Sequence, residues 1–405
     1  MTDLNPVSPE NIRDPYPLYK ELRDNHPVHW SEVVHAWIIT RYDDVVACFR
    51  DPRLSTNRLN FYSFQLQGSD PAIAEDVLGV LSKQMAMKDG IDHLRVRRHA
   101  SQGFSPQALD AWRPSIRRIM TMLVDRVHAE GRMDVVSHIS YQLPPLVIAD
   151  LMGVPPEDRG LFQSWAKPIA QFSSPTVGVD MVEVTKQANR AMQEFKAYLF
   201  KIVEERRHHP GQDVLSQMIH FQEGGGMSMD ELLSNANLIL TAGHVTVTDQ
   251  LTTGLHNLLS HPDQLQKLRE DRSLIKSAVE EMLRYSPALP FSVRIAKQDI
   301  QLHGKTIPKD SVVFLGSASA NRDPKVFPDP DRFDITRDHI HQKHLGFGFG
   351  AHHCLGAGLA RRELEIALEV MLDRMPGLRL DEDSPPRLKL DTLFFRGFNS
   401  MHVRW

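Results

Sequence analysis

The feature that most constrains the fold is a long stretch without proline near the middle of the chain. Ser228 and Glu231 match a capping box, in which the first residue and the one three positions later bond each other's backbone at a helix start. The next proline is Pro262, so the sequence predicts a helix over about residues 229–261. At about 1.5 Å per residue this helix spans about 50 Å, so it must cross the core of its domain.

Small residues interrupt the middle of this predicted helix. Gly243 costs about 1 kcal/mol relative to alanine there, so it needs a packing or functional reason. The Thr246 hydroxyl can bond the preceding turn, which leaves a groove with a hydroxyl beside it. The groove suits a diatomic ligand, and two small residues at a crossing of helices explain the pattern equally well.

One of the two cysteines lies in a glycine-rich loop near the C-terminus. Cys354 directly precedes a helix-like run that starts near Gly358, so the helix dipole favours its thiolate form. The glycines permit positive φ and let a flat ligand approach the main chain. A lone cysteine is more often an apolar core residue, and this is our interpretation of Cys48, on the apolar face of a predicted helix over 42–49.

The spacing around Cys354 distinguishes it from an ordinary cysteine. The pattern Phe-Gly-x-Gly-x-His-x-Cys-x-Gly fixes six residue types over ten positions. The chain fills all six, with Phe347, Gly348, Gly350, His352, Cys354 and Gly356. Residues 347–356 therefore resemble the haem-binding loop of the cytochrome P450 family. The resemblance implies that Cys354 is the axial ligand of the haem iron and that His352 reaches a haem propionate. It also implies haem contacts for the three residues Phe347, Gly348 and Gly356.

Further basic residues occur where the family has them. His93 and Arg97 are four residues apart, so they share one face of a helix and could hold two carboxylates. Alone, such a pair is usually a solvated basic face. The resemblance implies instead that His93 and Arg97 bind haem propionates and that Arg294 binds a propionate from the other side.

A Glu-x-x-Arg pattern precedes the cysteine loop. Glu281 and Arg284 have the spacing of an ordinary surface salt bridge on a helix. The resemblance implies instead a buried structural pair, with Arg332 bonding into it. The chain also shows strand-like pieces around residues 393–395. By the same resemblance, the substrate pocket includes Leu289, Pro290, Val293, Leu393 and Phe394.

Ala242, Gly243 and Thr246 look like the oxygen-binding motif of the family. The family usually has Asp or Glu directly before the threonine, and this acid helps to deliver protons. The chain departs from the pattern, because Val245 stands there and a valine carries no proton.

This departure leaves several hypotheses open. Normal monooxygenation is preferred, with protons moving through Thr246, ordered water, His244, Asp249 or a polar group of the substrate. One alternative is a haem-thiolate peroxygenase or an oxidative coupling enzyme. Another is a non-catalytic protein of this fold that binds haem or a ligand.

Composition excludes some classes of function. The 405-residue chain has a formal net charge of −4 and a pI of about 6.6, without the basic excess of a nucleic-acid-binding protein. Two cysteines imply no disulfide framework and fit a reducing compartment. Residues 1–13 are polar and lack the pattern of a signal peptide. We therefore expect a cytoplasmic protein with no membrane and no nucleic-acid partner.

The expected fold is mainly α, the cytochrome P450 fold, as a single domain over residues 1–405. It has a large helical part and a β-rich part over about 25–60, with strands at 28–30 and 36–40. The resemblance implies haem b (iron protoporphyrin IX) between the long central helix and the loop at 347–356. It further implies O2-dependent hydroxylation or epoxidation of an apolar small molecule such as a polyketide, macrolide or terpene. Because no Gly-x-Gly-x-x-Gly fingerprint occurs, electrons from NAD(P)H are expected to arrive through a ferredoxin and a ferredoxin reductase.

Overall fold

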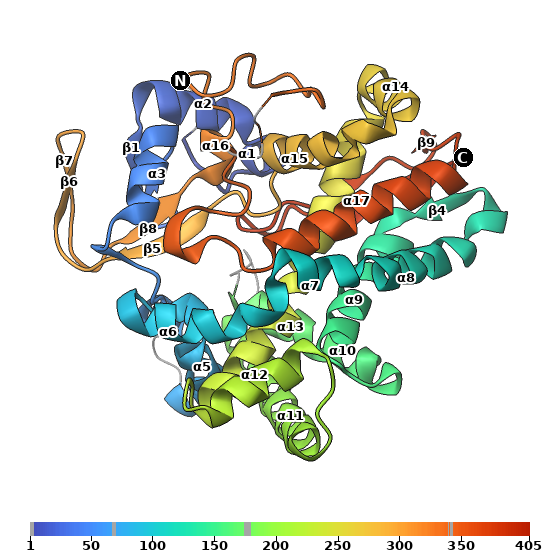
Figure 1. Ribbon diagram of the computed structural model, residues 1–405. Helices are drawn as coiled ribbons and strands as arrows, with labels where there is room; N and C mark the ends of the chain where they lie inside the picture. The colour runs from blue at the N-terminus through green and yellow to red at the C-terminus, as the bar shows by residue number, and fades with distance from the viewer. Residues whose placement is uncertain (1–3, 67–69, 174–179, 339, 341–342) are drawn as a thin grey trace. The chain divides into compact units, whose positions relative to one another are not determined.

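The computed structural model describes residues 4–66, 70–173, 180–338, 340 and 343–405 (Figure 1). The chain forms two compact units, each assembled from separated stretches. Unit 1 contains residues 1–54, 114–143 and 246–405, and unit 2 contains residues 55–113 and 144–245. That residues 1–405 make a single domain stays a prediction.

The main sheet of unit 1 draws its strands from two distant stretches of the chain. Its strand order is β1-β2-β8-β5-β3. The strands are β1 (Val28–Ser31), β2 (Ala36–Ile39), β3 (Leu54–Ser55), β5 (Ser292–Ala296) and β8 (Val312–Leu315). β1 and β2 form an antiparallel hairpin, and β2 runs parallel to β8 with Trp37 opposite Val313. The strands predicted at 28–30 and 36–40 are confirmed, but the β-rich part also needs residues 292–315.

Helices supply most of the remainder of unit 1. α15 packs against α17 (Figure 1). The helices are α1 (Pro9–Arg13), α2 (Tyr16–Asn25), α3 (Tyr42–Arg50), α8 (Arg113–Asp125), the later part of α13 (Met229–Leu259), α14 (Pro262–Glu270), α15 (Ile275–Tyr285), α16 (Ser317–Ala320) and α17 (Ala357–Arg374).

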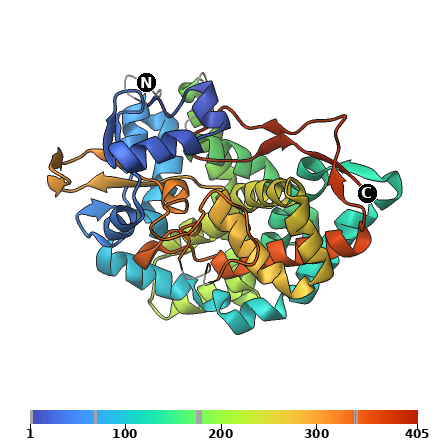
Figure 2. The ribbon, with the colours of Figure 1, turned by 90° about the horizontal axis from the view of Figure 1, so that it is seen from above.

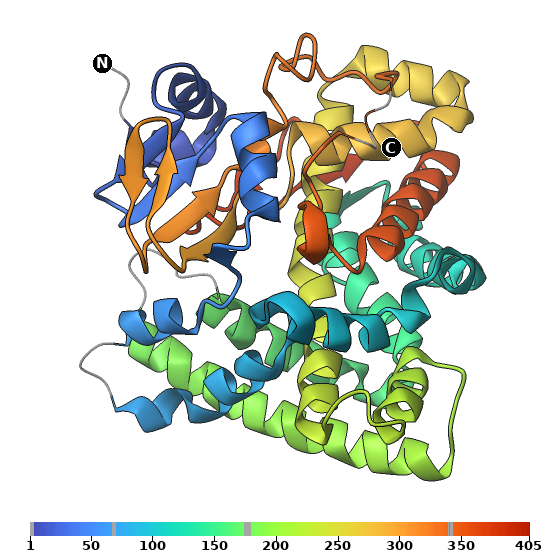
Figure 3. The same ribbon diagram turned by 60° about the vertical axis from the view of Figure 1, so that its left-hand side comes forward.

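Apolar residues cover both faces of the main sheet. Figure 3 shows the N-terminal helices, in blue, beside this sheet. Successive strand residues point to opposite faces, so the neighbours Ile38 and Ile39 enter different clusters. Ile39 packs in a cluster with Cys48 of α3, and Ile38 in a cluster with Leu22 of α2. Cys48 is only 7% exposed, which confirms its place in the core.

Short strands make three smaller sheets in unit 1. β6 (Ile300–Leu302) and β7 (Lys305–Ile307) form a hairpin that projects from the rest of the unit (Figures 1 and 2). The second sheet has the order β4-β12-β9 and the third pairs β10 with β11. Their bounds are β4 (Arg132–Asp134), β9 (Arg379–Leu380), β10 (Arg387–Leu388), β11 (Phe398–Ser400) and β12 (His402–Arg404).

The strand expected around residues 393–395 is wrong. These residues form the loop between β10 and β11. The Phe394 N–H donates to Thr392 Oγ1 at 3.1 Å. This local bond from a threonine side chain competes with strand pairing.

Unit 2 is helical. α10 and α11 pack against each other through aromatic rings, with Trp165 stacked on Phe195 at a centroid distance of 5.1 Å. Its helices are α4 (Leu59–Gln65), α5 (Glu75–Lys83), α6 (Gly90–Ala100), α7 (Pro106–Ala111), α9 (Leu143–Leu151), α10 (Arg159–Ser173), α11 (Met181–His208), α12 (Val214–Glu223) and the first part of α13 (Met229–Leu259).

The long helix predicted from the capping box is α13, with 31 residues. The box is confirmed, because the Ser228 N–H donates to Glu231 Oε2 at 3.0 Å and the Glu231 N–H donates to Ser228 Oγ at 3.1 Å. The helix ends at Leu259, two residues before the predicted end. His261 precedes Pro262 and adopts φ −123° and ψ 79°, because a residue before proline avoids the helical region. No helix among the described residues, α13 included, is long and apolar enough to cross a membrane.

Candidate active site

The Cys354 loop has a backbone shape that requires its glycines. Gly348 and Gly350 have φ of 70° and 75°, where other L-residues are strained. A Cβ on Gly350 would also come within 3.3 Å of the Phe49 carbonyl. The Cys354 N–H donates to the Phe347 carbonyl at 2.9 Å, which closes the loop on itself.

Cys354 is exposed and lies directly before α17. Gly356 is the N-cap of that helix, and the Ala357 N–H donates to the Cys354 carbonyl at 3.4 Å. The free N–H groups and the dipole at a helix start stabilise an anionic atom nearby. His352 ends a short 3-10 turn (Gly350–His352) two residues earlier. The loop therefore presents one accessible sulfur in a setting that favours negative charge.

The set of possible metal ligands fits haem better than a site made of side chains alone. Among the described residues, no group of three or more His, Cys, Asp or Glu side chains could hold a metal ion. Iron bound to Cys354 would therefore need most of its ligands from another molecule, and the nitrogens of a porphyrin provide them. The open glycine loop suits the flat face of such a ring.

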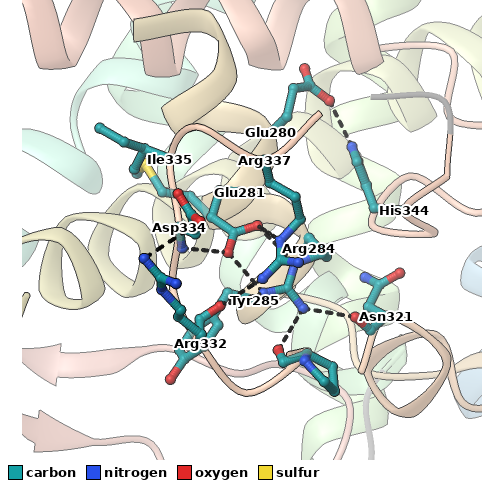
Figure 4. A network of polar contacts seen from close by, with 12 residues as sticks. Glu280, Glu281, Arg284, Tyr285, Asn321, Arg332, Asp334, Ile335, Arg337 and His344 are labelled. Carbon is teal, nitrogen blue, oxygen red and sulfur yellow. Dashed lines mark hydrogen bonds and ion pairs between the residues drawn. The ribbon is translucent and has the colours of Figure 1, made fainter. Parts of the chain in front are cut away.

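A charged network that the sequence did not reveal supports the loop from α15 and α17. His344 Nε2 lies 2.7 Å from Glu280 Oε2, as Figure 4 shows, and the Gly346 N–H donates to His344 Nδ1 at 3.1 Å. Nδ1 accepts this bond, so the proton of a neutral His344 is on Nε2 and points to Glu280. Arg361 donates its Nε–H to Glu280 Oε1 at 2.6 Å and lies over the Phe347 ring at 4.6 Å. The network thus holds both ends of the segment that leads into the loop.

Acid titration is expected to show how much this network stabilises the protein. Burial alone would raise the pKa of Glu280, but hydrogen bonds from His344 and Arg361 outweigh burial and lower it from 4.5 to about 2. The pKa of Glu280 is lower in the folded protein than in the unfolded chain. The ionised carboxylate therefore contributes its full stabilisation of the fold above about pH 4.5, and this stabilisation is lost as the pH falls toward 2. A difference of this size corresponds to about 3 kcal/mol. Urea unfolding between about pH 6 and about pH 3 should therefore show a smaller loss of stability in Glu280→Gln than in the parent. An equal loss in both proteins would contradict the assignment.

Glu281 and Arg284 form a fully buried ion pair (Figure 4). Arg284 Nε and Nη2 donate to the two carboxylate oxygens of Glu281 at 2.7 and 2.8 Å. The guanidinium also donates to the carbonyls of Asn321, Pro330 and Arg332. The pair therefore ties α15 to the irregular segment that follows α16.

Arg332 bonds into this pair, as expected, through its backbone. Its carbonyl accepts a bond from Arg284, while its own side chain is 60% exposed and lies 3.9 Å from Asp334. Arg337, whose Nε lies 3.5 Å from Glu281 Oε2, is the second guanidinium beside the buried carboxylate (Figure 4). The family motif did not point to Arg337. Nothing in the neighbouring sequence indicates that this basic residue of an irregular segment contacts a buried carboxylate.

Arg294 lies beside the cysteine loop within unit 1. It belongs to β5, is 5% exposed, and its guanidinium lies 5.2 Å from the centroid of the Phe49 ring. The same ring would be 3.7 Å from a Cβ on Gly348. Phe49 of α3, which no motif singled out, therefore brings Arg294 and the loop together. The predicted contact of Arg294 with a propionate stays a prediction.

His93 and Arg97 lie one turn apart in α6 of unit 2, as their spacing predicted. His93 is 1% exposed. Burial lowers the pKa of His93, Arg97 lowers it further, and Asp89 opposes them. His93 is therefore neutral at pH 7 and can donate one N–H to a carboxylate. Binding of propionates by this pair stays a prediction.

The middle of α13 keeps accessible surface. Ala242 is exposed and Gly243 and Thr246 are partly exposed, whereas residues 247–255 are buried. A Cβ on Gly243 would meet Ile148 at 4.0 Å, an ordinary contact distance, so packing within unit 2 does not require glycine. This observation favours the interpretation of a ligand groove over a tight helix crossing in that unit.

Predicted pocket residues from two segments meet in unit 1. Leu289 is 37% exposed and Pro290 is buried. The Phe394 ring contacts that of Phe314 edge-on at 5.2 Å. Three of the five pack, partly buried, against one apolar cluster: Val293, Leu393 and Phe394. Their role toward a substrate stays a prediction.

Comparison with known proteins gives relatives along the whole chain. The family model described as Cytochrome P450 matches residues 59–394. Cytochrome P450 CYP107DY1 of Priestia megaterium is 37% identical over 390 residues, which cover 93% of each chain. The 6-deoxyerythronolide B hydroxylase of Saccharopolyspora erythraea is 36% identical over 398 residues and 96% of each chain. The structure of epothilone B-bound cytochrome P450epoK has a TM-score of 0.90 at 30% identity, over 99% of each chain.

Proposed function

Because the chain belongs to the cytochrome P450 family, we propose that it hydroxylates or epoxidises an apolar polyketide or macrolide with O2. The family consists of haem-thiolate enzymes, and the chain is a monooxygenase. Hydroxylation follows RH + O2 + 2 e⁻ + 2 H⁺ → ROH + H2O. The substrate class is supported by two relatives, the 6-deoxyerythronolide B hydroxylase and the epothilone B-bound enzyme. A terpene is a further candidate of similar polarity.

The exposed sulfur of Cys354 at the start of α17 is the observation that carries this function. We propose haem b as the cofactor, whose iron the Cys354 thiolate would hold. When bound, the haem supplies the oxygen chemistry, which no side chain can perform. Four basic side chains would hold its propionates, namely His93, Arg97, Arg294 and His352.

The residues around this position have separate tasks. The bond from the Cys354 N–H to the Phe347 carbonyl fixes the backbone that carries the sulfur. Phe394 and Val293 present apolar surface, which orients an apolar substrate and excludes water. The hydroxyl of Thr246, on the accessible stretch of α13, holds a proton at Oγ1 that it can donate while the oxygen accepts a hydrogen bond from its surroundings.

Bacterial members of the family normally receive electrons from redox partner proteins. We propose that here a ferredoxin, reduced by a ferredoxin reductase with NAD(P)H, supplies both electrons. The cytoplasmic location expected from the sequence stays a prediction.

Absorption spectroscopy of the purified protein tests the proposal. The reduced protein exposed to carbon monoxide should show the long-wavelength Soret band of thiolate-ligated haem. Spectral shifts on adding macrolides, linear polyketides and terpenes would then rank the substrate classes. A folded, haem-reconstituted sample without the Soret band would overturn the proposal.

Thr246→Ala is expected to divert reducing equivalents from product to H2O2. The loss of a hydroxyl that holds a proton should lower product formed per O2 consumed by a factor on the order of ten to a hundred. Product, O2 and H2O2 are measured in one reaction with the ferredoxin system. Thr241→Ala is the matched control, because Thr241 lies in the same helix with its hydroxyl bonded to the Asn237 carbonyl at 2.8 Å. Unchanged coupling in Thr246→Ala would remove this residue from the proton route.

Val245 favours one second candidate function, a haem-thiolate peroxygenase or an oxidative coupling enzyme. A valine before Thr246 cannot provide a proton, and a reaction driven by H2O2 needs less proton delivery from the protein. Turnover with H2O2 that equals or exceeds turnover with the ferredoxin system would support this candidate.

A further inference from the structure

A buried carboxylate lies one helical turn after Thr246. Asp249 of α13 is 0% exposed and follows Thr246 by three residues, so the two side chains lie on adjoining turns of one helix face. Lys389 Nζ lies 2.6 Å from Asp249 Oδ1. The second oxygen, Oδ2, is buried and has no hydrogen-bond partner among the residues that the structure describes.

The segment from β10 to β11 covers this carboxylate. A Cβ on Gly397 would collide with the carboxylate of Asp249, so the backbone approaches closely there. The Lys389 N–H donates to the Gly397 carbonyl at 3.0 Å, which places the lysine on the same segment. The Lys389 side chain is 22% exposed, so it connects the buried carboxylate to the solvent.

Two charged groups act on this carboxylate. Burial raises the pKa of Asp249, the Lys389 ammonium lowers it, and Asp391 raises it again, with a net upward direction. The carboxylate is thus more readily protonated than an exposed one.

An ion pair that only anchors the segment would be expected to satisfy both oxygens, because an unsatisfied buried acceptor costs stability. A buried carboxylate oxygen without a hydrogen-bond partner is unusual in a folded protein, and a functional role is one explanation for it. Oδ2 can hold a proton, and one water molecule can join it to a hydroxyl one turn away. The reaction of the proposed function consumes two protons for each O2, and Val245 can supply neither.

We propose that Asp249 is the acid that feeds protons to Thr246, with Lys389 as its link to the solvent. A proton held on Asp249 Oδ2 passes through one water to Thr246 Oγ1 as the Thr246 proton moves on. The carboxylate is then reprotonated from solvent along Lys389. Asp249 acts through Thr246 and is a positioning and relay residue. The inference rests on the proposed function and assigns its proton route.

The first test observes the proton itself, without turnover. The purified protein is titrated while the infrared C=O band of protonated carboxyl groups is recorded in H2O and in D2O. We expect a band that shifts in D2O and is absent from Asp249→Asn, and that persists in Asp383→Asn. Asp383 is the matched control, because its side chain is 85% exposed and it lies in the same C-terminal part of the chain. A spectrum identical in parent and Asp249→Asn across the pH range would overturn the inference.

The second test measures coupling. Asp249→Asn should lower product formed per O2 by a factor on the order of a hundred, with a matching rise in H2O2. The carbon monoxide band and the spectral shift on substrate binding should stay as in the parent. Lys389→Met provides an independent variant in case Asp249→Asn does not fold. Because Lys389 lowers the pKa of Asp249, its loss should move the alkaline limb of the coupling profile to higher pH.

The two proposals fail in different ways. A parent protein without the carbon monoxide band overturns the proposed function, and no variant is needed to see it. A parent with the band whose Asp249→Asn and Lys389→Met variants only melt earlier, with unchanged coupling and pH profile, overturns the relay alone. That outcome would make the pair an anchor for the segment between β10 and β11.

Discussion

Cys354→Ser is expected to abolish the thiolate signature of the reduced, carbon monoxide-treated protein without unfolding it. Serine has nearly the same size, and the bond from the backbone N–H of residue 354 to the Phe347 carbonyl does not involve the sulfur. The side chain is exposed, so its replacement removes no core packing. A neutral hydroxyl is a poor donor of electron density to iron, so O2-dependent product formation should fall to background.

The other cysteine provides the matched control for this variant. Cys48 is buried in the cluster between α3 and the main sheet, and burial raises the pKa of its thiol to about 12. Cys48→Ala should therefore keep the spectrum of the parent and lose only some stability. Retention of the parental band in Cys354→Ser, or its loss in Cys48→Ala, would refute the assignment of the axial ligand.

Glu281→Gln is expected to lower the free energy of unfolding by about 3–5 kcal/mol, because it leaves the buried charge of Arg284 without its partner. Both side chains are fully buried, so water cannot replace the lost interaction. The Arg284 guanidinium also donates to three backbone carbonyls, so it cannot move away without breaking them. Urea unfolding monitored by circular dichroism measures the change.

An exposed ion pair of similar spacing is the control for this experiment. Lys20 and Asp24 lie one turn apart in α2, with side chains 66% and 46% exposed. Asp24→Asn should change stability by less than about 1 kcal/mol. A comparable loss in both variants would show that burial of Glu281 and Arg284 contributes little.

The features that could be predicted from the sequence depend on residues close together in the chain. The capping box at Ser228 and Glu231, the strands around 28–30 and 36–40, and the shared helix face of His93 and Arg97 all follow from local rules. The loop at 347–356 could be identified because its residue types are fixed at short intervals.

The features that could not be predicted join distant residues. Glu280 and His344 are 64 residues apart, and Asp249 and Lys389 are 140 apart. When the partner of a charged residue lies far away in the sequence, no periodic pattern indicates which residue it will contact in the folded protein. The loop at 393–395 was misjudged for the opposite reason, because its apolar residues suit a strand and a bond to the neighbouring Thr392 prevents it.

The parallel pairing of β2 with β8 has a consequence for how the cell makes this protein. Trp37 lies opposite Val313, so the ribosome must add 276 residues after Trp37 before its partner exists. At about 5–20 residues per second, roughly 15–60 s pass between the synthesis of β2 and that of β8. Until then the edge of β2 that pairs with β8 is unpaired. During that time an apolar strand with unsatisfied backbone groups is open to other nascent chains. The yield of folded protein should therefore depend on chaperones that bind this N-terminal segment during translation.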